Sequence, residues 1–277
     1  MTTSKSIFHL AMKEVAHNYR NYWVAIVGAV FFLLAFGLGN YGFSFSGGEV
    51  GSETILISYI HLQLYVVPVL GLLLSFDGIL QERESVMFDL YLSMSVKRSW
   101  LLIGKWIGLC VSLYMAILPG LLLQCATLVN AGLTPAECIP LSFYSLILCC
   151  IIVAIGVMVS TLSISRGTVI GAAFFIWLIF AVGMDFIIVA LLVGTKGDVS
   201  SALINTLFLI NPLSLFRLDS YSAYFPDEIS ELIQTGETSF SPVLLIIYQL
   251  LWIAAPLLIA RLNIGRFYSR IKLEARS

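Results

Sequence analysis

Residues 141–165 read LSFYSLILCCIIVAIGVMVSTLSIS and contain no charged side chain. A bilayer core about 30 Å thick is crossed by roughly 20 apolar residues in an α-helix, so this run is long enough to span a membrane. Five further apolar runs predict helical spans at residues 23–40, 55–76, 105–130, 168–193 and 243–260. The alternating segments of a membrane β-barrel are absent from the sequence. The predicted fold class is therefore all-α, a polytopic membrane protein with six transmembrane helices.

The composition of the whole chain agrees with this prediction. Of the 277 residues, 59% are hydrophobic and only 11% are charged, so polar side chains are too few to cover a water-soluble globule. Lys and Arg gather before the first span, after the second, fourth and sixth spans, and are sparse elsewhere. By the positive-inside rule this predicts that both termini are cytoplasmic. We expect a single transmembrane domain over residues 1–277.

Residues 1–21 predict an amphipathic helix on the cytoplasmic side. One narrow arc of this helix carries Ser6, His9, Lys13, His17 and Arg20. A helix of this kind lies in the interface between lipid and water. Its cationic side would face lipid headgroups or a partner protein, and the sequence favours neither alternative.

The connection at residues 77–100, DGILQERESVMFDLYLSMSVKRSW, holds an unusually large share of the charges in the chain. As a helix it would place Glu82, Ser85, Asp89 and Ser93 in one polar stripe. A solvated loop that only set the topology would need positive residues, because acids contribute little to topology. The acids therefore favour a short cytoplasmic helix that a soluble protein grips.

The outer connection at residues 194–241 predicts two short amphipathic helices that meet near Asn211 and Pro212. The polar and acidic stretch that follows is typical of a functional surface or of a disordered loop, and the functional surface is favoured. Arg217 is the only cation in the second half of this connection. We therefore expect it to pair with a neighbouring carboxylate or with a partner protein.

Asp185 and His61 are polar residues well inside predicted spans. A carboxylate in lipid is costly, so Asp185 should face the bundle interior, a cavity or a dimer seam. A proton or ion pathway is one interpretation, but a single acid without a relay favours structural pairing. His61 could be a ligand that points into the bundle, although a lone histidine there more often hydrogen-bonds to a neighbouring helix.

Sequence motifs give no support to an enzyme or a metal site. Four of the five cysteines fall inside predicted spans, and Cys138 reaches an outer connection without an obvious partner. The chain lacks HExxH, GxSxG and the phosphate-binding GxxxxGK[ST] motif. We expect no catalytic residue, no metal site and no cofactor in this chain, and no nucleic-acid partner.

Residues 72–108, LLLSFDGILQERESVMFDLYLSMSVKRSWLLIGKWIG, resemble the signature region of the ABC-2 family of ABC transporter permeases. In that family an acidic loop after the second span precedes a P-x-x-R…L-L-x-G-K stretch that opens the third. Gly104 and Lys105 agree with this pattern, whereas Met94 or Ser95 stands in place of the usual proline. The stretches SFDGILQERES and LINPLSLFRL are similar to the NosY type, which supports copper-centre assembly in nitrous oxide reductase during denitrification.

The resemblance implies an ABCG-like exporter architecture in the bacterial inner membrane. It implies a homodimer above a cytoplasmic ABC ATPase of the NosF type, which would hold ATP and Mg²⁺. An extracytoplasmic β-helical protein of the NosD type, a copper-chaperone lipoprotein of the NosL type and membrane lipids would be further partners. ATP hydrolysis would drive substrate export or mechanical work on an outer partner. The alternatives are an exporter of another substrate or a membrane scaffold without transport.

On this resemblance, two groups of residues become candidate functional sites. The predicted ATPase-coupling residues are Glu82, Arg83, Glu84 and Asp89. The predicted extracytoplasmic gate or partner contact consists of Asn211, Pro212 and Arg217.

Overall fold

The computed structural model of the chain describes residues 3–20, 22–45, 51–75, 98–162, 165–225 and 242–274. The elements in chain order are α1 (Thr3–Arg20), α2 (Trp23–Phe45), α3 (Ser52–Ser75), α6 (Arg98–Asn130), η1 (Pro135–Cys138), α7 (Ile139–Leu162), α8 (Arg166–Leu178), η2 (Ile179–Gly183), α9 (Met184–Gly194), α10 (Ser201–Ile210), α11 (Pro212–Tyr224) and α13 (Pro242–Glu274). Within the described residues every regular element is helical, which confirms the all-α prediction.

Five helical stretches in the described residues are long and apolar enough to cross a membrane. They are Ser52–Ser75, Ser99–Asn130, Pro135–Leu162, Gly167–Gly194 and Val243–Ile264. A sixth span is obtained if α1 and α2, which are bent by 69° relative to each other, count together. The number of spans therefore agrees with the prediction.

The third span begins earlier than the sequence predicts, at residue 98 or 99 rather than at Lys105. A lone charge within the lipid-embedded part of a span would be costly. Instead, Lys105 lies inside α6 and forms a salt bridge with Glu14. Its charge is compensated within the protein, so the helix can continue on both sides of it.

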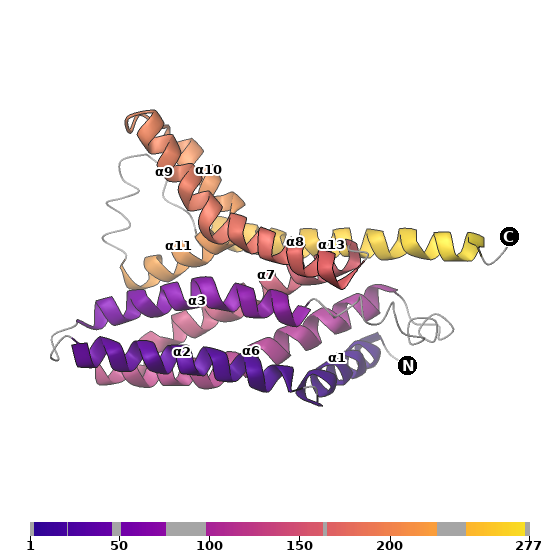
Figure 1. Cartoon of the computed structure of the whole chain (residues 1–277), viewed down its shortest axis with the longest axis horizontal. Coiled ribbons are helices and arrows are strands. Elements are labelled where there is room, and N and C mark those ends of the chain that lie inside the picture. Colours follow the sequence, from indigo (N-terminus) through magenta and orange to yellow (C-terminus); the bar gives the residue numbers. More distant parts are fainter. Residues whose placement is uncertain are drawn as a thin grey trace.

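The core of the molecule lies among α2, α3, α6 and α7. Figure 1 shows these helices side by side, with α1 and the C-terminal end of α13 at the same end of the bundle. The bundle buries 72% of the most apolar window of span Pro135–Leu162 and 67% of that of Ser52–Ser75, but only 11% of that of Gly167–Gly194. The fifth span therefore lies at the edge of the bundle.

The fifth span changes direction part of the way along its length. It consists of α8, the π-helical segment η2 and α9, and Figure 1 shows α9 turning away from the bundle after η2. Insertion of a π-turn is a common cause of bends in helices. The chain then returns through α10 and α11, which meet at Asn211 and Pro212 as the sequence predicts.

Candidate functional site

An ion pair joins α9 and α11 at the bend of the fifth span. The guanidinium of Arg217 donates from Nη1 to Oδ1 of Asp185 at 3.2 Å and from Nη2 to Oδ2 at 3.0 Å. Two parallel charge-assisted hydrogen bonds of this kind satisfy both carboxylate oxygens. The sequence predicts a structural partner for Asp185 and allows a carboxylate partner for Arg217. The structure shows that the two residues pair with each other.

Asn211 connects α11 to the fifth span at a second point. Its Nδ2 donates to the backbone carbonyl of Phe180 at 2.9 Å and to Oγ of Ser214 at 2.9 Å, while its Oδ1 accepts from the N–H of Leu213 at 3.0 Å. The last bond caps α11, and Pro212 occupies the first helical position, where its missing N–H costs nothing. Asn211 is 1% exposed, so its hydrogen bonds join α11 to the fifth span inside the protein.

His61, on α3, contacts the same helix, α11. Its ring stacks on Tyr65 with centroids 6.3 Å apart and meets Tyr221 of α11 edge-on at 6.5 Å. The sequence favoured a hydrogen bond to a neighbouring helix, and the structure shows contacts between rings. Among the described residues no three His, Cys, Asp or Glu side chains are grouped as a metal site would require.

A buried polar network in the centre of the bundle escaped the sequence analysis. Gln63 Nε2 donates to Gln124 Oε1 at 2.7 Å, and the hydroxyl of Ser145 donates to Gln63 Oε1. The hydroxyls of Tyr59 and Thr127 are 2.7 Å apart. The network joins α3, α6 and α7, and its amides could have been found as the isolated glutamines of otherwise apolar runs.

A second ion pair fastens α1 to α6 at the opposite end of the bundle. Nζ of Lys105 lies 3.1 Å from Oε2 of Glu14, and the two side chains are only 5% and 11% exposed. The helices approach closely because α6 presents glycine to α1: a Cβ on Gly104 would lie 2.7 Å from Cβ of Leu10, and one on Gly108 would lie 2.6 Å from Cβ of Glu14. The LLIGKWIG stretch is thus the docking surface for α1.

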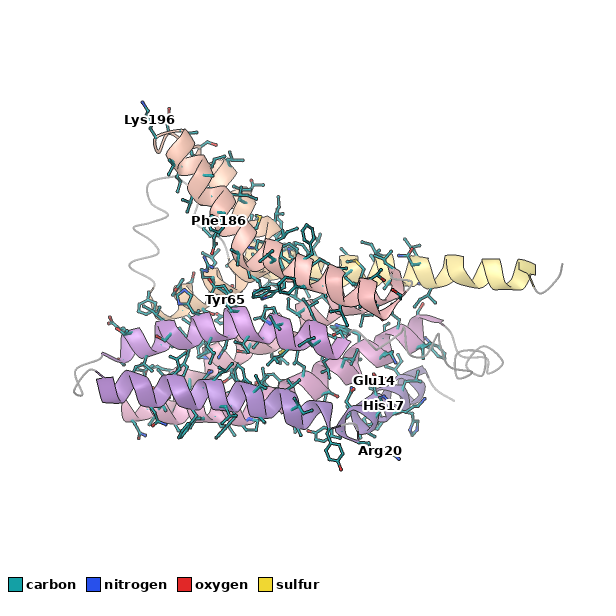
Figure 2. All side chains as sticks on the ribbon, in the orientation of Figure 1. Glu14, His17, Arg20, Tyr65, Phe186 and Lys196 are labelled. Carbon is teal, nitrogen blue, oxygen red and sulfur yellow. The ribbon has the colours of Figure 1, made fainter. Side chains whose placement is uncertain are left out.

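The surface of α1 divides into three sides rather than the two that the sequence predicts. Ala11, Glu14 and Asn18 are buried, and Asn18 donates to Ser112 of α6 at 3.4 Å. The cationic residues of the predicted arc are exposed, and Figure 2 shows His17 and Arg20 near the end of the helix. Phe8, Met12 and Tyr19 form an exposed apolar side between these two.

Comparison with known proteins assigns the chain to a family. Residues 8–268 match a family model described as "ABC-2 family transporter protein". The chain belongs to the ABC-2 transporter family. It is 30% identical over 229 residues to the "Probable ABC transporter permease protein NosY" of Pseudomonas aeruginosa and 28% identical over 228 residues to the protein of that name from Stutzerimonas stutzeri. Each alignment covers 79% of this chain and 82% of the relative.

The chain is accordingly the permease subunit of an ABC transporter, and its ATPase is a separate subunit. This ABC-2 permease has its predicted ATPase-coupling residues in the stretch 76–97, outside the described residues. Glu82, Arg83, Glu84 and Asp89 all fall there. The flanking elements are described, since α3 ends at Ser75 and α6 begins at Arg98. Any force applied to that stretch reaches these two helices first.

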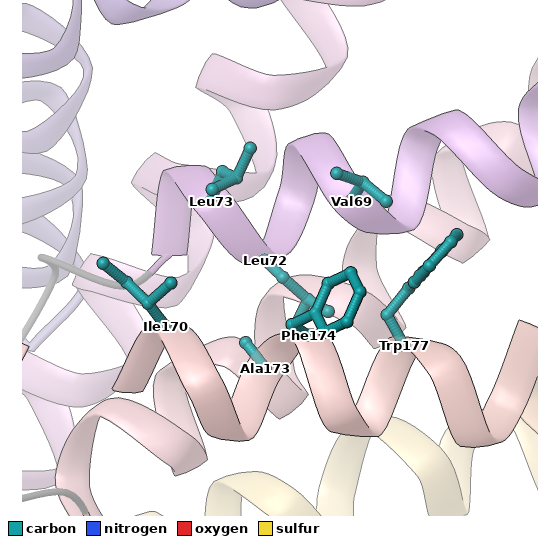
Figure 3. A pocket seen from close by; sticks show the side chains of 7 residues that line it. All are labelled: Val69, Leu72, Leu73, Ile170, Ala173, Phe174 and Trp177. Atoms are coloured by element: carbon teal, nitrogen blue, oxygen red, sulfur yellow. The ribbon is translucent and has the colours of Figure 1, made fainter. Parts of the chain in front are cut away.

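An apolar pocket of the ABC-2 permease lies where α8 crosses α3. Figure 3 shows the side chains that line it, which are Val69, Leu72, Leu73, Ile170, Ala173, Phe174 and Trp177. Nε1 of Trp177 also donates to the backbone carbonyl of Tyr65 at 3.2 Å. The α8 half of the fifth span is therefore attached to α3, whereas the α9 half leaves it.

Proposed function

We propose that this permease couples ATP hydrolysis in a separate cytoplasmic subunit to work on the outer side of the membrane, in support of copper-site assembly in nitrous oxide reductase. The observation that carries the proposal is the similarity to two NosY permeases over about four fifths of both chains. The work is export of a substrate or mechanical action on an outer partner. ATP and Mg²⁺ are held by the ATPase, and this chain contributes no cofactor.

The proposed contact with the ATPase is the acidic stretch that contains Glu82, Arg83, Glu84 and Asp89. Support comes from its position in the chain, directly before α6. Because α1 is fastened to α6 through Glu14 and Lys105, the two helices receive a force as one body. The proposed ATPase is of the NosF type.

The proposed contact with outer partners is formed by α11 and the connection after it, including Asn211, Pro212 and Arg217. Support comes from the attachment of α11 to the fifth span at Phe180 and Asp185. A β-helical partner of the NosD type or a copper-chaperone lipoprotein of the NosL type that pulls on α11 would act on a membrane span. Both termini are proposed to be cytoplasmic and the membrane to be the bacterial inner membrane.

A second copy of the chain is proposed to cover the fifth span. Only 11% of the apolar window of that span is buried, and 36% of the Asp185 side chain is exposed at a position inside the span. Lipid is a poor environment for a charged group. A second copy that faces the first across α8 and α9 would exclude lipid from the ion pair and could enclose a water-filled space between the two chains.

Two measurements in a denitrifying host that lacks its own NosY permease test the proposal. We expect this chain to restore the copper content of nitrous oxide reductase and to co-purify with the NosF-type ATPase. We expect the triple variant Glu82→Lys, Glu84→Lys and Asp89→Lys to insert normally but to recover much less ATPase, because charge pairs at an interface contribute to its affinity.

Each outcome separates the alternatives. Recovery of the ATPase without restored copper would indicate an exporter of another substrate. Insertion without any recovered ATPase would indicate a scaffold. Equal ATPase recovery with the wild type and the triple variant would rule out the acidic stretch as the contact.

A further inference from the structure

The bend in the fifth span leaves one backbone carbonyl without its usual helical donor. In an α-helix each N–H reaches the carbonyl four residues back, but the N–H of Met184 binds the carbonyl of Ile179, five residues back. Because α9 is α-helical from Met184 onward, its geometry assigns the N–H of Asp185 to the carbonyl four residues back, that of Ala181. The carbonyl of Phe180 is passed over, and within a membrane another part of the protein must supply its donor.

Asn211 supplies that donor from α11. Its Nδ2 lies 2.9 Å from the Phe180 carbonyl, and both hydrogens of the amide are used, the second by Ser214. The carbonyl that receives this bond is the one that the π-turn bypasses. The interaction therefore depends on the bend, and the bent form of the span is stabilised by it.

Arg217 holds the span on the other side of the same turn. Its bidentate pair with Asp185 is made at the second residue of α9, directly after η2 ends. Asn211 and Arg217 thus contact the fifth span at residues 180 and 185, on either side of the point where the direction changes. Two attachments fix an angle, whereas one attachment would leave a pivot.

The rest of α9 has little packing that could set its direction. After Met184 no residue of α9 is buried, and Phe186 and Val193 are 70% and 73% exposed. Figure 2 shows Lys196, at the tip of the hairpin of α9 and α10, far from the bundle. The direction of the hairpin is therefore decided at its base.

The base itself is attached firmly to the bundle, because α11 packs against α3, α7 and α13. Leu213 and Phe216 are buried. The hydroxyl of Tyr224 donates to the carbonyl of Glu137 at 2.5 Å and accepts from the N–H of Leu141 at 3.2 Å. Asp219 of α11 accepts a hydrogen bond from Gln249 of α13. A helix held in this way moves together with the bundle helices that it contacts.

We propose that α11 sets the angle at which the outer half of the fifth span leaves the bundle, with Asn211 and Arg217 as the positioning residues. Asn211 donates a hydrogen bond to the carbonyl that the bend leaves without a helical donor. Arg217 holds the first turn of α9 through Asp185. Movement of α11 relative to α8 is thereby converted into a change in the bend and a swing of the hairpin. This inference concerns the mechanics of the chain and does not depend on which substrate or partner the permease serves.

Distance measurements between spin labels on the full-length chain in lipid nanodiscs test this proposal. A ketone-bearing amino acid at Thr195, at the end of α9, and at Glu53, at the outer end of α3, can be labelled without touching the five native cysteines. Both positions are exposed. A second label pair at Glu53 and Ala136 reports whether the bundle itself is unchanged.

The variants distinguish the loss of either attachment from a general disruption of the fold. Asn211→Ser keeps an oxygen that can cap α11 but removes the amide donor to Phe180. Asp185→Asn combined with Arg217→Gln removes the ion pair, and Asp185→Arg combined with Arg217→Asp restores it in reverse. Ser214→Ala is the matched control, because it removes the other acceptor of the Asn211 amide and leaves the Phe180 contact in place.

We expect one narrow Glu53–Thr195 distance distribution in the wild type and in Ser214→Ala. Asn211→Ser and the uncharged double variant should each broaden or shift it, the reversed pair should return it toward the wild type, and the Glu53–Ala136 distance should stay constant. If Asn211→Ser does not fold, the ion-pair variants alone decide. An unchanged Glu53–Thr195 distribution after removal of either attachment would overturn the proposal.

Discussion

The two ion pairs of this permease lie at opposite ends of the bundle and differ in how completely the protein encloses them. Glu14 and Lys105 are 11% and 5% exposed, whereas Asp185 and Arg217 are 36% and 22% exposed. The first pair joins helices that pack closely, and the second joins helices at a bend. In the proposed dimer the exposed part of the second pair faces the space between the two chains, where water can replace either partner, whereas the enclosed pair has no such access. The end of the bundle that holds α1 is therefore expected to move as one body, and the end at the bend is expected to change its shape.

Removal of one member of the enclosed pair should have the largest effect on stability. In Lys105→Met the Glu14 carboxylate stays buried without its cation, and losses of about 3–5 kcal/mol are typical of such changes. Thermal unfolding in detergent, followed by tryptophan fluorescence, measures this loss. The double variant Glu14→Leu with Lys105→Met should recover much of it, because the Glu14 carboxylate is then removed together with its cation. Equal losses in the single and the double variant would show that the charge is not the cause.

The close approach of α1 and α6 should be the next most sensitive feature. A Cβ at Gly108 would lie 2.7 Å from the backbone oxygen of Ala11 as well as 2.6 Å from Cβ of Glu14, so Gly108→Ala should force the helices apart. Overpacking of this kind costs about 1–3 kcal/mol. Gly171→Ala is the matched control, because a Cβ there meets nothing within 4 Å and alanine favours a helix. A Gly108→Ala variant as stable as Gly171→Ala would contradict the tight contact.

The sequence predicts the spans well because lipid imposes the same requirement on every one of them, a long apolar run in a helix. It also predicts that Asp185 and Arg217 need partners, since an isolated charge is costly. It does not reveal that they pair with each other, because they are 32 residues apart on two elements whose relative placement depends on the bend. No residue pattern in residues 179–183 predicts a π-turn there. Pro68, Pro119 and Pro256, at which the sequence predicts kinks rather than helix ends, all lie within continuous helices.

A second buried acid sharpens the comparison, because Asp219 has an amide partner in place of a cation. Burial in α11 raises the pKa of Asp219 from 3.8 to about 7, against the opposing effect of its hydrogen bond from Gln249. A folded-state pKa above the unfolded value means that the folded protein holds the proton more tightly. The stabilisation is complete below about pH 4 and is lost as the pH rises through 7.

Thermal unfolding at several pH values measures this effect. We expect the wild type to lose about 1 kcal/mol of stability between pH 6 and 8. Asp219→Asn should remove most of that slope, because the amide cannot titrate, while Asp198→Asn, on an exposed residue of the hairpin tip, should leave it unchanged. A slope that is the same in wild type and Asp219→Asn would assign the titration to another group.

The partly exposed pair of Asp185 and Arg217 should contribute least to stability, in contrast to the enclosed pair of Glu14 and Lys105. Asp185→Asn keeps an oxygen that can accept from Arg217, and the guanidinium that loses its counter-charge is already in partial contact with the surroundings. Partly exposed pairs contribute about 0–1 kcal/mol, so unfolding of Asp185→Asn should differ from the wild type by no more than that. The same unfolding measurement, made beside Lys105→Met, checks both ends of the molecule at once. If Asp185→Asn were as destabilising as Lys105→Met, the Asp185–Arg217 pair would hold its helices as tightly as the Glu14–Lys105 pair does, and the bend would have no special freedom to change its shape.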